Sequence, residues 1–142
     1  MAIKVLIVDD EQEFAELLSE RLEARGFKTR VALNGDEAVL RMREEIADVV
    51  LLDVMMPGKS GVLTLKEIKT SWPLSEVIML TGHGTVETAI EGMKLGAYDY
   101  LLKPSATEEL SEKIRTAYKR KSEQEAQLRQ AEIDKIIETK GW

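Results

Sequence analysis

Five short apolar segments, each followed by a segment in which apolar residues recur at helical spacing, constrain the fold more than any other feature of this sequence. The apolar segments cover residues 3–8, 28–33, 49–52, 77–80 and 98–102. Most of them run without polar interruption, which indicates strands buried on both faces of a parallel sheet. Parallel strands need right-handed crossover connections, and the helices between these segments supply them.

We therefore predict an α/β fold: a (βα)5, doubly wound, parallel five-stranded sheet with strand order 2-1-3-4-5, flavodoxin-like in topology. The 142 residues are too few for an eight-stranded barrel, which needs roughly 250. Asn34 is expected at the N-cap of the second helix. Residues 105–140 contain neither Gly nor Pro, which predicts an extended C-terminal helix capped by Ser105. We assign residues 1–120 to the domain and residues 121–142 to the extended C-terminal helix or linker.

Composition limits the environment and the partners. The chain has no cysteine, which excludes disulfides and thiolate metal sites and fits a reducing compartment. Its apolar runs are too short for a membrane span and its N-terminus lacks a signal-peptide pattern, so we expect a cytoplasmic protein. The net charge of −6 lies entirely in residues 1–104, because residues 105–142 carry eight acids and eight bases. This acidic balance argues against nucleic-acid binding by this chain.

Polar residues stand at the ends of four predicted strands: Asp9 and Asp10, Asp53, Thr81 and Lys103. Ligands of doubly wound sheets bind beyond the carboxyl ends of the strands, so we expect these side chains to converge. Three carboxylates this close repel one another unless a cation is present, and oxygen ligands without His or Cys favour Mg²⁺. The alternative is that each aspartate only caps the helix that follows, and Asp10 stands just before one.

A carboxylate in such a site can accept a phosphoryl group, and Asp53 is the best candidate because it ends the most apolar strand. Lys103 would neutralise the phosphoryl oxygens as a point charge, and Thr81 would donate its hydroxyl to them. The alternatives are a solvated lysine and a hydroxyl that satisfies a local backbone group. We also hypothesise a cis peptide bond between Lys103 and Pro104, because only bonds before proline adopt cis at low cost.

Together these segments resemble the receiver domain of two-component response regulators, over residues 1 to about 120. The resemblance rests on residues 5–10, 51–58 with Gly61, 81–82 and 100–104, in this order and at this spacing. It implies that Asp53 receives a phosphoryl group from the phosphohistidine of a histidine kinase. It also implies that Mg²⁺ is held by Asp9, Asp10, Asp53 and the backbone carbonyl of Met55.

The same resemblance implies that Thr81 and Tyr100 form a switch pair. The hydroxyl of Thr81 would move to the phosphoryl group and the ring of Tyr100 would turn inward, altering the surface of the fourth helix, fifth strand and fifth helix. An output partner, or a second copy of the chain in a homodimer, would recognise this surface. A receiver is not an enzyme beyond catalysing its own phosphorylation and dephosphorylation.

Residues 81–90 are similar to the receivers of NtrC-like transcription activators. Those proteins continue into an ATPase domain and a DNA-binding domain, but no GxxxxGK[ST] loop occurs here. We therefore expect either a stand-alone receiver or one excised from a longer protein, with an output domain or partner that the sequence does not identify. Residues 121–142 would be a solvated helix, a short dimerising coil or a linker.

Three other functions fit the sequence less well. A phosphatase with an aspartyl-phosphate intermediate would carry a general acid two residues after Asp53, where Met55 stands. An interaction module that never accepts phosphate would have lost the acids or the lysine, and all are present. A flavodoxin-like cofactor binder would need a Ser/Thr/Gly loop after the first strand, where this chain has Asp-Asp-Glu.

Overall fold

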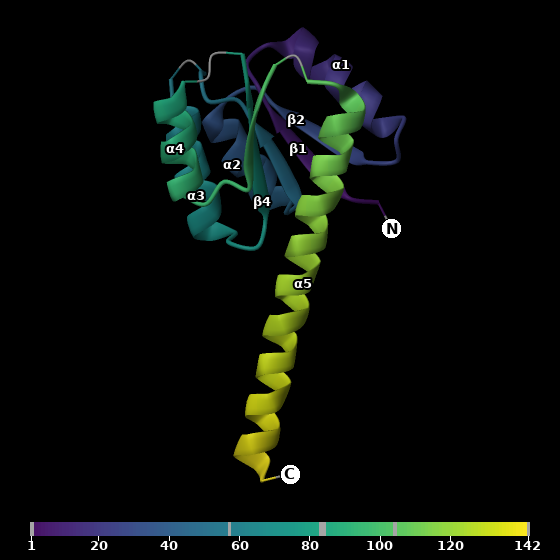
Figure 1. Cartoon of the computed structure of the whole chain (residues 1–142), viewed down its shortest axis with the longest axis vertical. Coiled ribbons are helices and arrows are strands. Elements are labelled where there is room, and N and C mark those ends of the chain that lie inside the picture. Colours follow the sequence, from purple (N-terminus) through teal and green to yellow (C-terminus); the bar gives the residue numbers. More distant parts are fainter. Residues whose placement is uncertain (1, 57, 83–84, 104, 142) are drawn as a thin grey trace.

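A computed structural model describes residues 2–56, 58–82, 85–103 and 105–141. Strands and helices alternate along the whole chain (Figure 1), as the apolar pattern predicts. The elements are β1 Lys4–Val8, α1 Gln12–Glu23, β2 Lys28–Ala32, α2 Gly35–Glu44, β3 Val49–Leu52, α3 Gly61–Ser71, β4 Glu76–Thr81, α4 Val86–Lys94, β5 Asp99–Leu102 and α5 Thr107–Lys140.

The five strands form one parallel sheet in the order β2-β1-β3-β4-β5. Every residue of β3 and β4 is buried, which explains why these strands carry continuous rather than alternating apolar residues. The predicted fold class and strand order are confirmed. The order reverses between β1 and β3, so these two neighbouring strands define the edge at which a doubly wound sheet binds its ligands.

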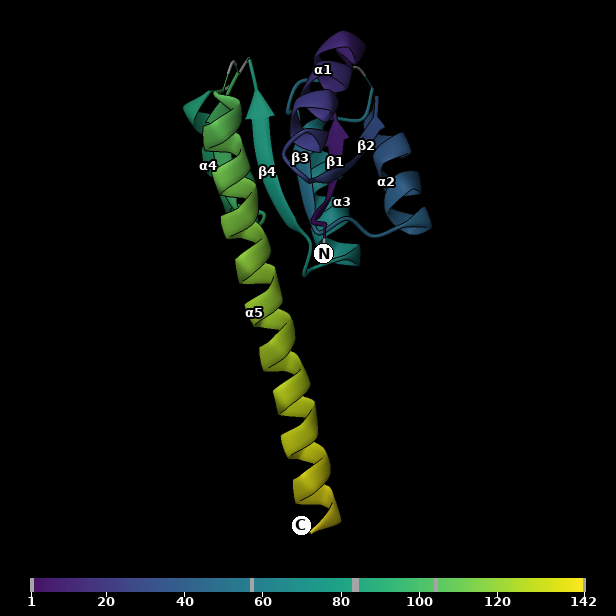
Figure 2. The ribbon, with the colours of Figure 1, turned by 90° about the vertical axis from the view of Figure 1, so that its right-hand side faces the viewer.

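Helices cover both faces of the sheet (Figures 1 and 2). On one face α1 and α5 pack on the strands, with Leu22 and Ile114 completely buried. On the other face α2 and α3 bury Met42 and Leu65, and α4 lies beside α3. Burying the apolar side of each helix in this way supplies most of the free energy that holds the layers together.

Side-chain caps mark the starts of three helices. The Oδ1 atom of Asn34 accepts a hydrogen bond from the backbone N–H of Glu37 at 2.8 Å, which confirms the predicted cap of α2. Ser60 caps α3 and Thr85 caps α4 in the same manner. These bonds satisfy N–H groups that have no acceptor within the helix.

The predicted cap of α5 is wrong. Ala106, not Ser105, is at the N-cap, and no side chain caps this end. The helix begins one residue later than the serine suggests, and its first turn carries Glu108 and Glu109 instead. Negative charge in the first turn favours a helix N-terminus electrostatically, so these acids compensate for the missing cap.

Helix α5 has a packed part and a projecting part. Leu110, Ile114 and Ala117 are buried against the sheet, whereas residues 126–141 are exposed and the helix extends away from the domain (Figures 1 and 2). At the transition Lys121 Nζ lies 2.9 Å from Asp48 Oδ1, just before β3. None of the helices in the described part of the chain, α5 included, combines the length and apolar character needed to cross a membrane.

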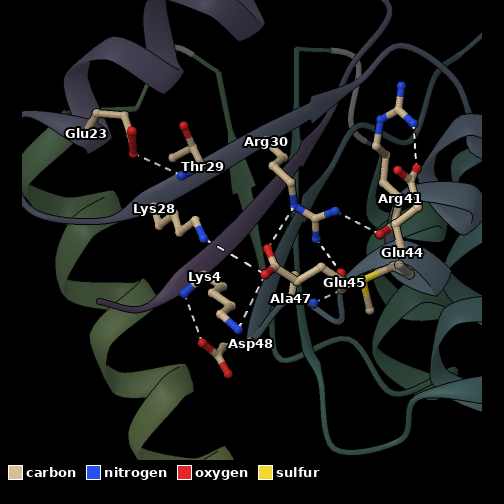
Figure 3. Close-up of polar contacts among 11 residues, drawn as sticks. Lys4, Glu23, Lys28, Thr29, Arg30, Arg41, Glu44, Glu45, Ala47 and Asp48 are labelled. Atoms are coloured by element: carbon tan, nitrogen blue, oxygen red, sulfur yellow. Dashed lines mark hydrogen bonds and ion pairs between the residues drawn. The ribbon is translucent and has the colours of Figure 1, made fainter. Parts of the chain in front are cut away.

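Ion pairs connect the amino ends of the strands (Figure 3). The carboxylate of Glu45, after α2, lies 3.6–3.9 Å from cationic groups of Lys4, Lys28 and Arg30 on β1 and β2. Asp48 Oδ2 accepts a hydrogen bond from the backbone N–H of Lys4 at 2.9 Å. Because these side chains are partly exposed, each pair stabilises the fold only slightly, and their main effect is to fix the α2–β3 connection.

We expect Ile114→Ala to lower the free energy of unfolding by about 2–5 kcal/mol, because it empties a buried position between α5 and the sheet. Ile136→Ala is the matched control, since Ile136 is exposed in the projecting part of the same helix, and it should change stability by less than about 0.5 kcal/mol. Urea denaturation followed by circular dichroism measures both. An equal loss of unfolding free energy in the two variants would contradict the division of α5 into a packed part and a projecting part.

Candidate functional site

Backbone hydrogen bonds continue the sheet one residue beyond β1, β3 and β5. They fix the backbone from which the candidate side chains of Asp9, Asp53 and Lys103 extend. The N–H of Asp9 donates to Ala32 and that of Asp53 donates to Val8, at 3.0 and 2.9 Å. The N–H of Lys103 donates to the carbonyl of Thr81 at 2.8 Å. The strand ladder therefore positions the candidate residues, although they are far apart in the sequence.

Three carboxylates meet at this edge. Carboxylate oxygens of Asp9, Asp10 and Asp53 all lie within 4.8 Å of one another. Asp9 and Asp53 are only 2% and 3% exposed, whereas Asp10 is exposed. The Oδ1 atom of Asp9 accepts the N–H of Glu11 at 2.9 Å, and that of Asp53 accepts the N–H of Met55 at 3.1 Å. These turn bonds hold one oxygen of each buried carboxylate.

The second oxygens of the buried carboxylates face Lys103. Its Nζ atom lies 2.5 Å from Asp9 Oδ2 and 3.4 Å from Asp53 Oδ2. It also lies 3.0 Å from Glu11 Oε1 and 4.3 Å from the centre of the Phe14 ring. The lysine side chain is only 10% exposed, so these groups replace most of the water that an ammonium ion requires.

The pKa values reflect this burial. Burial raises the pKa of Asp9, and the hydrogen bond from Lys103 offsets only part of that effect. For Lys103, burial by itself lowers the pKa, but the hydrogen bonds to Asp9 and Glu11 and the negative charges of Asp9 and Asp53 together outweigh it, so its pKa is raised and it stays an ammonium ion at neutral pH. The raised pKa of Asp9 means that the effect of burial outweighs the hydrogen bonds from Lys103 and from the N–H of Glu11.

This donor set fits a hard divalent cation. All three side chains offer carboxylate oxygens, which Mg²⁺ prefers, and their spacing lets them converge on one ion. A divalent cation would also offset the cost of burying the carboxylates of Asp9 and Asp53. Asp9, Asp10 and Asp53 are the residues that would hold it. The backbone carbonyl of Met55 stays a predicted fourth ligand.

The loop after Asp53 folds back tightly onto its own backbone. The N–H of Gly61 donates to the carbonyl of Val54 at 3.0 Å. A Cβ atom at Gly61 would overlap the carbonyl oxygen of Asp53 and lie 2.6 Å from the Cα of Val54. Only glycine allows this close approach, which explains why a glycine stands at this point of the sequence.

The two predicted switch residues lie on neighbouring strands. Thr81 ends β4 and is completely buried. Tyr100 pairs with Met79 in the β4–β5 register and is half-buried against the core. Its hydroxyl lies 3.3 Å from the Oγ1 atom of Thr88 on α4, a long hydrogen bond. Tyr100 thus links the strand beside Thr81 to helix α4.

The structure brings together Asp9, Asp10, Asp53 and Lys103, as the strand ends predict. The alternative that Asp10 caps α1 is wrong, because Glu11 is at the N-cap and no side chain caps it. The predicted cis peptide involves Pro104, which lies outside the described residues.

Sequence reasoning missed three residues around the site: Glu11, Phe14 and Thr88. Glu11 and Phe14 contact Lys103, and Thr88 contacts Tyr100. An acid directly after the two aspartates was a usable signal for Glu11. Neither Phe14 nor Thr88 carried such a signal, because Phe and Thr occur on many helices that take no part in a functional site.

Comparison with known families agrees with this geometry. The family model of the response regulator receiver domain matches residues 5–115. The chain belongs to this family. It is a receiver domain of two-component response regulators, as the resemblance of its sequence segments to that family implies.

Named relatives of this receiver domain are longer proteins. The transcriptional regulatory protein ZraR of Salmonella typhimurium is 37% identical over 126 residues, which are 89% of this chain and 29% of ZraR. The transcriptional regulatory protein CpxR of Klebsiella pneumoniae is 44% identical over 117 residues, 82% of this chain and 50% of CpxR. The chain therefore spans half or less of these relatives.

Among solved structures, NtrX of Brucella abortus superimposes with a TM-score of 0.82 at 32% sequence identity. The match covers 89% of this chain and 29% of NtrX. This similarity agrees with the resemblance of residues 81–90 to NtrC-like receivers.

We expect Gly61→Ala to lower the free energy of unfolding by about 1–3 kcal/mol, because the added methyl group overpacks against the backbone of Asp53 and Val54. Chemical denaturation of the purified receiver measures the loss. A variant as stable as the wild type would contradict the close approach of Gly61 to this backbone.

Proposed function

We propose that Asp53 of this receiver domain accepts a phosphoryl group from the phosphohistidine of a histidine kinase. The observation that carries the proposal is the setting of its carboxylate. It is buried, one oxygen is held by the N–H of Met55, and the other faces Lys103 beside two more acids. This is a nucleophile next to groups that stabilise anionic oxygens.

In the transfer, an oxygen of Asp53 forms a bond to phosphorus while the bond between phosphorus and the imidazole nitrogen breaks. The imidazole leaves with that bonding pair, and the product on Asp53 is an acyl phosphate. The ammonium of Lys103 neutralises charge on the phosphoryl oxygens and Thr81 donates its hydroxyl to one of them. Mg²⁺, held by Asp9, Asp10, Asp53 and the carbonyl of Met55, would supply further positive charge to the same oxygens.

The readout involves Thr81 and Tyr100. When the hydroxyl of Thr81 turns to the phosphoryl group, the ring of Tyr100 moves inward and its long bond to Thr88 is lost. This movement changes the surface of α4, β5 and α5, which carries exposed apolar residues such as Ile90 and Leu102. The proposal is supported by the half-buried position of Tyr100, because a ring between core and surface has room for two packings.

The chain acts as a switch in the cytoplasm and not as an enzyme with an external substrate; it catalyses only its own phosphorylation and dephosphorylation. Its output partner is another protein, a second copy of the chain, or a further domain of a longer protein. The length of ZraR and the similarity to NtrX favour the receiver of an NtrC-like transcription activator as the second candidate.

We expect incubation with Mg²⁺ and acetyl phosphate or phosphoramidate to add one phosphoryl mass to the wild type, read by intact-mass spectrometry. Asp53→Asn should show no adduct, because an amide oxygen is a poor nucleophile. Asp134→Asn, a matched change on the exposed part of α5, should keep it.

Base treatment should release the adduct, as expected for an acyl phosphate, and chelation of Mg²⁺ should prevent its formation. An adduct that survives in Asp53→Asn, or none in the wild type with Mg²⁺, would refute the proposed phosphorylation.

Beryllofluoride mimics the phosphoryl group, and with Mg²⁺ we expect it to change amide hydrogen exchange in α4 and β5 while leaving α2 unchanged. In Thr81→Ala most of this change should disappear, because the hydroxyl that couples Asp53 to Tyr100 is missing. Mass spectrometry detects the exchange segment by segment. An equally large change in Thr81→Ala would contradict the switch role.

A further inference from the structure

Glu11 is at the N-cap of α1 without acting as a cap. Short oxygen-bearing side chains are preferred at this position because they accept an N–H bond from the first turn. The side chain of Glu11 makes no such bond. Its Oε1 atom instead lies 3.0 Å from Nζ of Lys103, 92 residues away in the chain. The side chain of Glu11 therefore contributes to the site and not to the helix end.

Lys103 has two sets of partners. The inner set is Asp9 and Asp53, both buried. The outer set is the carboxylate of Glu11, whose side chain is 61% exposed, and the ring of Phe14. The ammonium lies between the two sets and contacts both.

A divalent cation in the acid cluster competes with the inner contacts. Asp9 and Asp53 are ligands in the proposed metal site, and Asp9 is also the nearest partner of Lys103. Two positive centres on the same buried carboxylate repel one another strongly, because little water screens them. Metal binding therefore requires Lys103 to move away from Asp9.

We propose that Glu11 and Phe14 form an outer binding site for the side chain of Lys103. This site holds the ammonium group on the solvent side of the acid cluster when a divalent cation is bound among Asp9, Asp10 and Asp53. Glu11 already contacts Lys103, and as a positioning residue it raises metal affinity because this contact becomes stronger once the ammonium leaves Asp9. Phe14 assists, because its ring face attracts a cation without adding charge. The inference rests on the metal site of the proposed function.

The test is the dissociation constant for Mg²⁺, with Mn²⁺ as a second probe, measured by calorimetry on the full chain. Glu11→Gln should weaken binding about two- to fivefold, the range expected for a partly exposed ion pair. Glu13→Gln is the matched control. It removes the same charge from the first turn of α1, where Glu13 is exposed and pairs with no cation among the described residues, so it should have a clearly smaller effect.

Two further variants separate positioning from simple charge. Glu11→Asp keeps the charge but shortens the side chain and suits the N-cap better, so it should fold well and still weaken metal binding. In a Lys103→Met background, Glu11→Gln should have a smaller effect than in the wild type, because the lysine through which Glu11 acts is absent.

An effect of Glu11→Gln that is equal in both backgrounds, or Glu11→Asp with wild-type affinity, would overturn the inference. Undiminished metal binding in Glu11→Gln would overturn it too, but would leave the proposed function intact. The absence of metal binding in every variant, wild type included, would refute the metal site itself and with it both proposals.

Discussion

Two carboxylates, those of Asp9 and Asp53, are almost completely removed from water at the edge of the sheet, and the ammonium of Lys103 contacts both. An isolated buried carboxylate is strongly unfavourable, so this arrangement persists only with a cation close by. The ammonium of Lys103 supplies part of this positive charge. Burial still raises the pKa of Asp9, and the three carboxylates at this place form a donor set that suits a divalent cation.

The parallel sheet makes this concentration of charge possible. Backbone bonds at the ends of β1, β3 and β5 hold Asp9, Asp53 and Lys103 in place, and the completely buried strands β3 and β4 give the centre of the sheet a close-packed setting. The amino ends of the strands, at the opposite side of the sheet, hold structural ion pairs instead. There Asp48 and Glu45 form ion pairs with lysines and an arginine, and α5 extends away from the domain. Chemistry and helix anchoring thus occupy opposite ends of the same strands.

The route from the site to the surface is short. Thr81 ends β4, Tyr100 lies on the adjacent strand β5, and Thr88 of α4 contacts the tyrosine hydroxyl. In the proposed switch, phosphorylation of Asp53 would alter one buried hydroxyl, that of Thr81, and one half-buried ring, that of Tyr100, and through them helix α4. Packed cores favour discrete arrangements over gradual deformation, which suits a switch with two states.

The sequence by itself determined the order of strands and helices, the parallel sheet and the meeting of Asp9, Asp53 and Lys103. Continuous apolar runs report burial on two faces, and the carboxyl ends of parallel strands must share an edge. Only the tertiary structure decided that Glu11 and Phe14 contact Lys103, and that α5 begins without a serine cap. Periodicity records which face of an element is buried, whereas a contact between residues 92 positions apart depends on how side chains from separate elements point once the layers have packed.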